Sequence, residues 1–125
     1  MRRLTLFTAL LGLIALPALA DGDPAAGEKV FKKCKACHDV GADAKNKVGP
    51  VLNGVVGRTA GTYPDFSYSD AMKTAGEEGL VWDEETLDKY LKKPKDVVPK
   101  TKMTFAGLRK EDDIKDVIAY LETFE

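Results

Sequence analysis

Apolar residues recur with the period of a helix at several places along the chain. The clearest repeat lies near the C-terminus and follows the spacing i, i+3, i+4 and i+7: Ile114, Val117, Ile118 and Leu121. This spacing puts the four side chains on one face and predicts an amphipathic helix over residues 110–123. Three further short helices are predicted over residues 24–34, 69–76 and 84–93. Each begins with a side chain that can accept hydrogen bonds from the first turn: Asp23, Ser69 and Asp83.

Two long segments, residues 39–67 and 94–107, have neither a helical nor a strand period and are rich in glycine or proline. Irregular segments of this length are unusual in a compact domain unless they serve a function. About four short helices cannot cover both segments with core side chains. The pattern therefore predicts an all-α fold in which something other than the chain supplies apolar mass at the centre.

The first 20 residues differ from the rest: a basic start, an apolar run over Leu4–Leu16, and small residues at Ala18–Ala20. This layout predicts a secretory signal peptide over residues 1–20, because the apolar run is too short for a comfortable membrane span. Residues 21–125 then form a single domain with no membrane anchor. Loss of two arginines leaves 17 basic (19 minus 2) and 20 acidic residues, a net charge of −3 that argues against nucleic-acid binding.

Both cysteines and the only histidine of the chain fall within five residues, as Cys34, Cys37 and His38. A disulfide is the ordinary outcome in an exported protein, but between Cys34 and Cys37 it would close a very small loop and stabilise little. Zinc would find only three ligands. A thioredoxin-like dithiol would need strands alternating with helices, and that pattern is missing.

The fourth interpretation is covalent haem attachment, for which Cys-x-x-Cys-His is the known sequence. Two thiols at the end of one helical turn can each add to a vinyl group at the haem edge. The next residue, His38, then places an imidazole below the iron. One haem c would also be the large apolar plate that the irregular segments wrap. A redox dithiol is the alternative, and it predicts that no haem stays bound after denaturation.

The iron needs a sixth ligand, and residues 21–125 hold no second histidine but two methionines. Met72 lies in the predicted helix 69–76, where core packing is the ordinary role. Met103 lies in the irregular segment 94–107, from which a loop can bring a thioether over the opposite haem face. Both are candidates from the residues alone.

Several stretches together resemble the class I cytochromes c, in particular the bacterial cytochrome c2 and c550 type and mitochondrial cytochrome c. They are CKACH, VGPVLNGVVGRTAG, FSYSDAM, WDEETLDKYLKKPKDVVPKTKMTFAG and VIAYL. The resemblance covers Gly22–Leu121 and implies the class I cytochrome c fold, with short helices and long loops around one covalently attached haem c. It also implies axial ligation by His38 and Met103, the pairing that raises the potential of cytochromes c.

The resemblance implies a set of residues around the haem, beyond the covalent bonds to Cys34 and Cys37. The Pro50 carbonyl would accept a hydrogen bond from the His38 ring and orient it. Three residues would surround the propionates: Arg58, Tyr68 and Trp82. Three others would lie beside the Met103 loop: Tyr90, Thr101 and Phe105.

A protein of this type is expected to be a periplasmic one-electron carrier between membrane-bound redox complexes. These would be a cytochrome bc1 complex and a terminal oxidase, a reductase or a photosynthetic reaction centre. It is expected to be a monomer and not an enzyme, because side chains fill both axial positions and no substrate need touch the iron. If Met103 does not bind, a haem peroxidase or a gas-binding protein is the alternative.

Basic residues gather in the two segments that carry the predicted iron ligands. Twelve of the 17 are Lys29, Lys32, Lys33, Lys35, Lys45 and Lys47, then Lys89, Lys92, Lys93, Lys95, Lys100 and Lys102. The acidic residues cluster instead at Glu77–Asp88 and Glu111–Asp116. We therefore expect a lysine ring around the exposed haem edge, which would steer acidic redox partners. Such steering is screened by salt over about 8–10 Å.

Overall fold

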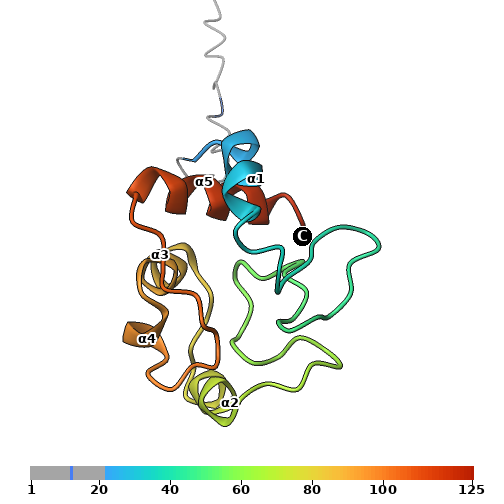
Figure 1. Cartoon of the computed structure of the whole chain (residues 1–125), viewed down its shortest axis with the longest axis vertical. Coiled ribbons are helices and arrows are strands. Elements are labelled where there is room, and N and C mark those ends of the chain that lie inside the picture. Colours follow the sequence, from blue (N-terminus) through green and yellow to red (C-terminus); the bar gives the residue numbers. More distant parts are fainter. Residues whose placement is uncertain (1–11, 13–21) are drawn as a thin grey trace, which may run out of the picture.

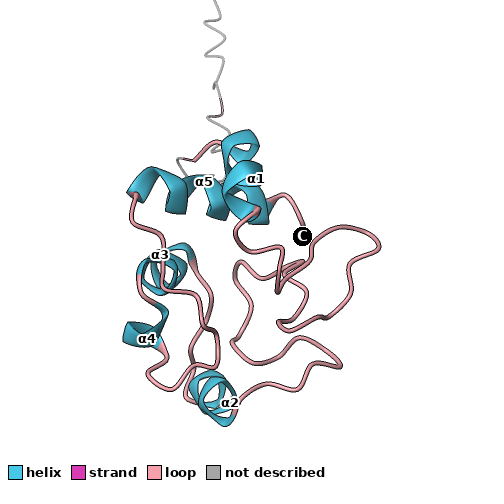
Figure 2. Cartoon of the chain, viewed as in Figure 1, coloured by secondary structure: helices cyan, strands magenta, loops and turns pink. Residues whose placement is uncertain are grey.

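The computed structural model describes residue 12 and residues 22–125, so the predicted signal peptide lies, apart from residue 12, outside the described residues. Helices are the only regular elements of this part of the chain, besides one isolated bridge between Thr59 and Val81 (Figure 2). They are α1 (Pro24–Phe31), α2 (Asp70–Glu77), α3 (Glu84–Lys92), α4 (Pro94–Val97) and α5 (Glu111–Glu122). The all-α prediction is confirmed.

The three predicted N-caps form as expected. The side chains of Asp23, Ser69 and Asp83 each accept a hydrogen bond from the first turn of their helix, at 3.0, 3.2 and 2.8 Å. The first helix is shorter than predicted, because α1 ends at Phe31. Beyond it the chain continues in tight turns, in which the N–H groups of Cys37 and His38 both donate to the Cys34 carbonyl.

Helix α4 corrects the prediction that residues 94–107 are wholly irregular. Pro94 takes the first position of this single turn, where its fixed backbone angle suits a helix and its missing N–H costs nothing. The Val98 N–H donates to the Pro94 carbonyl at 3.0 Å and closes the turn. Residues 98–107 then run without regular structure, as expected.

Helices α1 and α5 cross at one end of the molecule, and α3 packs on α5 (Figure 1). The crossing is tight at Gly27, where an added Cβ would lie 1.9 Å from the Asp116 carbonyl oxygen. Phe31 is 1% exposed, and its ring lies 5.5 Å from that of Tyr120. This end of the molecule is therefore built from direct helix-to-helix contact.

The opposite end consists of loops and α2. Within the described residues, α2 packs against no other helix and has no fully buried residue. It is tied instead to a loop, because Gly76 lies against the Ala60 carbonyl and the Ala60 N–H donates to Leu80. No helix of the described residues is long and apolar enough to cross a membrane.

Candidate cofactor site

Cys34 and Cys37 lie half-buried in the turns after α1 and form no disulfide. Burial raises the pKa of the Cys34 thiol, and the neighbouring Cys37 adds to the rise, while Lys33 opposes it. The position is set by the turn, in which the Cys34 N–H donates to the Phe31 carbonyl at 2.7 Å. Cys34 thus packs against the core, with Cys37 one turn further along the chain.

The His38 ring is fixed from two sides. Its Nδ1 lies 2.8 Å from the Pro50 carbonyl oxygen, which can only accept a hydrogen bond, so Nδ1 carries the proton and Nε2 keeps a free lone pair. Gly49 is buried against the same ring, where an added Cβ would lie 2.4 Å from Cε1. Burial lowers the pKa of His38, more than the Pro50 carbonyl raises it, which favours the neutral imidazole that binds metals.

Met103 lies in a second cluster, formed by α3 and the segment after α4. The buried Tyr90 hydroxyl donates to the Met103 sulfur at 3.5 Å, and the Met103 N–H donates to Thr101 Oγ1 at 3.2 Å. Burial raises the pKa of Tyr90, with Thr101 opposing, so the hydroxyl stays a donor. Phe105 packs half-buried against the core, as does Met72 from α2.

Trp82 connects this cluster to a third group of predicted residues. Its buried ring lies 4.6 Å from that of Tyr90, centroid to centroid. Its backbone N–H donates to the Arg58 carbonyl at 2.9 Å, and the Gly57 N–H returns a bond to the Trp82 carbonyl. Arg58 and Trp82, both predicted beside the propionates, are therefore neighbours, joined by these backbone hydrogen bonds.

Sequence reasoning missed two residues of the third group, Asn53 and Tyr63. The Arg58 guanidinium donates to the Asn53 carbonyl at 2.9 Å and lies 4.9 Å above the centre of the Tyr63 ring. The Tyr63 N–H in turn donates to the Tyr68 hydroxyl at 2.9 Å. No local period marks either residue. The one sequence signal near them is Pro64, which follows Tyr63 and indicates a turn.

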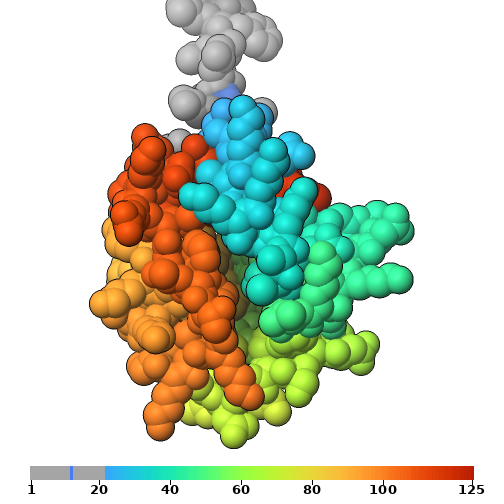
Figure 3. Space-filling model, in the orientation of Figure 1, coloured from blue at the N-terminus to red at the C-terminus, as the bar shows by residue number. Residues whose placement is uncertain are grey.

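The three clusters face a common interior. Cys34 and Met103, far apart in sequence, both pack against one core cluster that includes Trp82 and Tyr90. Figure 3 shows a narrow opening between the orange segment near residue 100 and the cyan-to-green segments that follow α1. A cavity of about 680 Å³ opens between α2 and residues 97–102 and reaches Tyr68, but it touches neither cysteine. Two cysteine thiols, an imidazole nitrogen with a free lone pair and a thioether fit the attachment and ligation of a haem c.

This fold and site define a class of haem-binding electron-transfer proteins, and the comparisons agree. Residues 24–125 match the family described as Cytochrome c. The chain is 61% identical over 106 residues to cytochrome c2 of Rhodomicrobium vannielii, covering 85% of this chain and 82% of that protein. It is 48% identical over 124 residues to cytochrome c2 of Blastochloris viridis, covering 99% and 94%. A solved structure of cytochrome c2 from Rhodospirillum centenum matches with a TM-score of 0.78 at 50% identity, covering 82% and 98%.

The chain belongs to the cytochrome c family. Members of this family are electron carriers that hold haem c covalently, so the predictions of family, fold class and cofactor are confirmed.

Proposed function

We propose that this protein is a periplasmic one-electron carrier between membrane-bound redox complexes. The observation that carries the proposal is the pair of prepared ligand groups: the His38 ring with only Nε2 free, and the Met103 thioether beside Tyr90. When bound, haem c supplies a reversible one-electron change at its iron. Cys34 and Cys37 would hold it by thioether bonds, with His38 and Met103 as axial ligands.

The protein side chains would leave no open position on the iron, which favours a carrier over an enzyme. The Tyr90 hydroxyl would hold the Met103 sulfur in place, and Thr101 would fix the loop through the Met103 N–H. Pro50 would keep the His38 ring in one orientation. A ligand set that moves little between the two oxidation states suits rapid electron transfer.

The propionate groups would lie beside Arg58, Tyr68 and Trp82. A guanidinium and two ring donors can neutralise and hydrogen-bond two carboxylates that would otherwise be costly to bring near a dry interior. Burial lowers the pKa of Arg58, while Tyr68 and Tyr63 oppose the shift. Phe105 would exclude water on the Met103 side.

Removal of residues 1–20 is supported by the lengths of the relatives. The Blastochloris viridis cytochrome c2 aligns over 124 residues and so includes the N-terminal segment. The match to the solved Rhodospirillum centenum chain covers 98% of that chain but only 82% of this one. N-terminal sequencing of the periplasmic protein tests this directly, with Asp21 expected as the first residue.

The lysine ring is the proposed docking surface for acidic partners, among them a cytochrome bc1 complex as donor and an oxidase, reductase or reaction centre as acceptor. All twelve lysines are exposed. Lys89, Lys92 and Lys93 lie within 4.0 Å of carboxylates of the same chain, which weakens their outward field. Lys35 and Lys102 are therefore better probes, with Lys115, which lies among acids in α5, as the control.

The ligand assignment is tested by visible spectra and redox titration of Met103→Ala beside Met72→Ala. Met103→Ala should lose the weak sulfur–iron band at the red edge and show a lower reduction potential, because a soft thioether favours the ferrous state. Met72→Ala should keep both properties. The reverse pattern would exclude Met103 as the ligand.

A further inference from the structure

The Asn53 side chain is held by a reciprocal pair of hydrogen bonds. The Gly41 N–H donates to Asn53 Oδ1 at 2.9 Å, and Asn53 Nδ2 donates to the Gly41 carbonyl at 2.8 Å. The side-chain amide thus pairs with both backbone groups of one residue, Gly41, as a residue on a neighbouring antiparallel strand would. Because both ends of the amide are bound, the Asn53 backbone is fixed relative to Gly41.

Gly41 belongs to the segment that follows His38 directly. A second bond ties the same two segments, since the Leu52 N–H donates to the Asp39 carbonyl at 3.0 Å. The backbone carbonyl of Asn53 makes a separate contact: it accepts a hydrogen bond from the Arg58 guanidinium at 2.9 Å. Asn53 therefore stands between the histidine segment and the arginine proposed for the propionates.

We propose that Asn53 is a positioning residue, which fixes the Arg58 guanidinium for the haem propionates by clamping its own peptide to Gly41. The inference rests on the proposed role of Arg58. Among the described residues, the guanidinium is held by the Asn53 carbonyl, to which it donates, and by the face of the Tyr63 ring below it. Loss of the clamp loosens one of these two contacts, and the charge then spends part of its time further from the cofactor.

A positive charge near the haem favours the reduced state, because reduction removes one positive charge from the iron. Coulomb energy falls with distance and with the solvent that enters a loosened site. Displacement of Arg58 should therefore lower the reduction potential, as removal of Arg58 should. A side chain that only stabilised the loop would leave the potential unchanged.

The test is a double-mutant cycle on the holoprotein, with reduction potentials from redox titration. Arg58→Ala and Asn53→Ala should both lower the potential, and the double variant should match Arg58→Ala alone, because the two act through one group. Asn46→Ala is the matched control. Its side chain likewise accepts from Val51 and donates to the Pro64 carbonyl, at 2.9 and 3.3 Å, but it does not contact Arg58. It should lower stability and leave the potential unchanged.

Hydrogen exchange of the Gly41 amide shows whether the clamp has opened. If Gly41 exchanges faster in Asn53→Ala while the potential stays at the wild-type value, the proposal is overturned, as it is by additive shifts in the double variant. If Arg58→Ala itself leaves the potential unchanged, the role of Arg58 at the propionates fails, and the inference with it. If Asn53→Ala does not mature, Asn53→Asp against Asn46→Asp gives the same comparison with the added charge matched.

Discussion

The two ends of this molecule are held together in different ways. At one end, α1 and α5 pack on each other, and their fully buried apolar side chains, among them Phe31, Ile114 and Val117, belong to one core cluster. At the other end, residues 39–81 contain only one helix, α2, which has no fully buried residue and packs on no other helix in the described part of the chain. Specific polar contacts connect this loop region, such as those of Asn46 and Asn53.

The difference indicates where the cofactor matters for folding. The apolar contacts between α1 and α5 are made by protein side chains alone, so they can form without haem. To the buried core cluster the loop region adds only the small side chains of Val55 and Ala60, and it has no helix-to-helix contact among the described residues. Its hydrogen bonds add only modest net stability each. Its fold should therefore depend on the haem that it surrounds, whereas the helical end should depend on it less.

The largest expected effect is that of removing haem attachment. In the double variant Cys34→Ala/Cys37→Ala, amide protection should disappear over residues 39–81 while residual protection stays in α1 and α5. The reason is that the loop region loses the large apolar plate that it surrounds. Hydrogen exchange measured residue by residue on the haem-free chain and the holoprotein tests this. Equal loss of protection at both ends would contradict the comparison.

Gly27→Ala should be the most damaging single change to the helical end. The new Cβ would lie 1.9 Å from the Asp116 carbonyl, so α1 and α5 must separate, at a cost of about 3 kcal/mol of unfolding free energy. Gly54→Ala in the loop region is the control. Its Cβ meets nothing within 4 Å, and only the positive φ of 68° opposes it, at a cost of about 1 kcal/mol. Urea denaturation of both holoproteins gives the two values, and a smaller loss for Gly27→Ala would contradict the steric argument.

The sequence predicted the helices well because their signals are local. A cap such as Ser69 lies next to the helix that it starts, and the apolar period of α5 is contained in the helix itself. Helix α4 was missed because four residues are too few to show a period. Its start at Pro94 directly follows the helix predicted over residues 84–93, where proline more often marks the end of a helix.

The site was predictable in part for a related reason. The haem motif is contiguous, and the resemblance supplied its distant partners. Asn53 and Tyr63 were not predicted, because their roles depend on contacts between separate loops that no local spacing encodes. Asn53 meets Gly41 and Arg58 only in the folded arrangement of these loops.

Ser69→Ala should weaken α2 without weakening the helical end. The Ser69 hydroxyl oxygen accepts from the Met72 N–H, and loss of such a cap costs about 1 kcal/mol. Because α2 contacts no other described helix, faster amide exchange should stay within residues 70–80. Ser67→Ala, an exposed serine outside the helix, is the control. Faster exchange in α5 would show that the two ends are coupled more closely than the contacts indicate.

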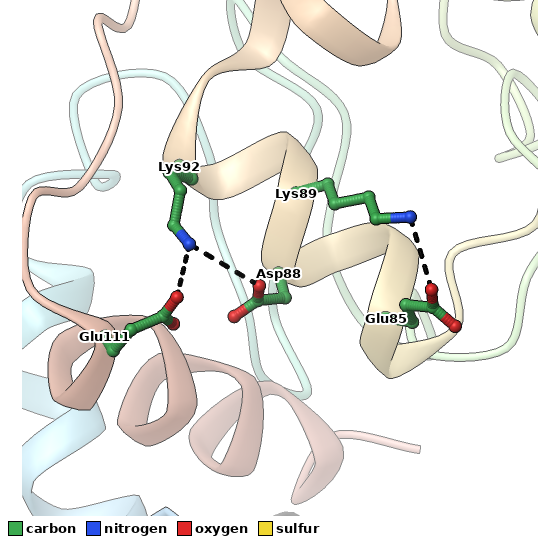
Figure 4. Close-up of polar contacts among 5 residues, drawn as sticks. All are labelled: Glu85, Asp88, Lys89, Lys92 and Glu111. Atoms are coloured by element: carbon green, nitrogen blue, oxygen red, sulfur yellow. Dashed lines mark hydrogen bonds and ion pairs between the residues drawn. The ribbon is translucent and has the colours of Figure 1, made fainter.

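The smallest effect concerns the polar connection between α3 and α5 (Figure 4). The Lys92 ammonium binds Glu111 of α5 and lies 4.0 Å from Asp88 of its own helix, whereas Lys89 pairs at 3.2 Å with Glu85 inside α3. The hydrogen bond from Lys92, and then that from Asp88, lowers the pKa of Glu111. Burial, and then Glu111, raises the pKa of Asp88.

A lowered pKa means that Glu111 stabilises the fold above its unfolded-state pKa, and that this contribution is lost as the pH falls through its folded-state pKa. The raised pKa of Asp88 acts in the opposite direction, so the net effect is small, as for most exposed ion pairs. Lys92→Met should therefore lower stability slightly at neutral pH and raise the pKa of Glu111 toward its ordinary value. The loss of unfolding free energy relative to the unchanged protein should shrink as the pH falls and Glu111 becomes protonated. Lys89→Met should leave the Glu111 pKa unchanged, and NMR titration of the Glu111 carboxyl in both variants decides whether Lys92 links the two helices.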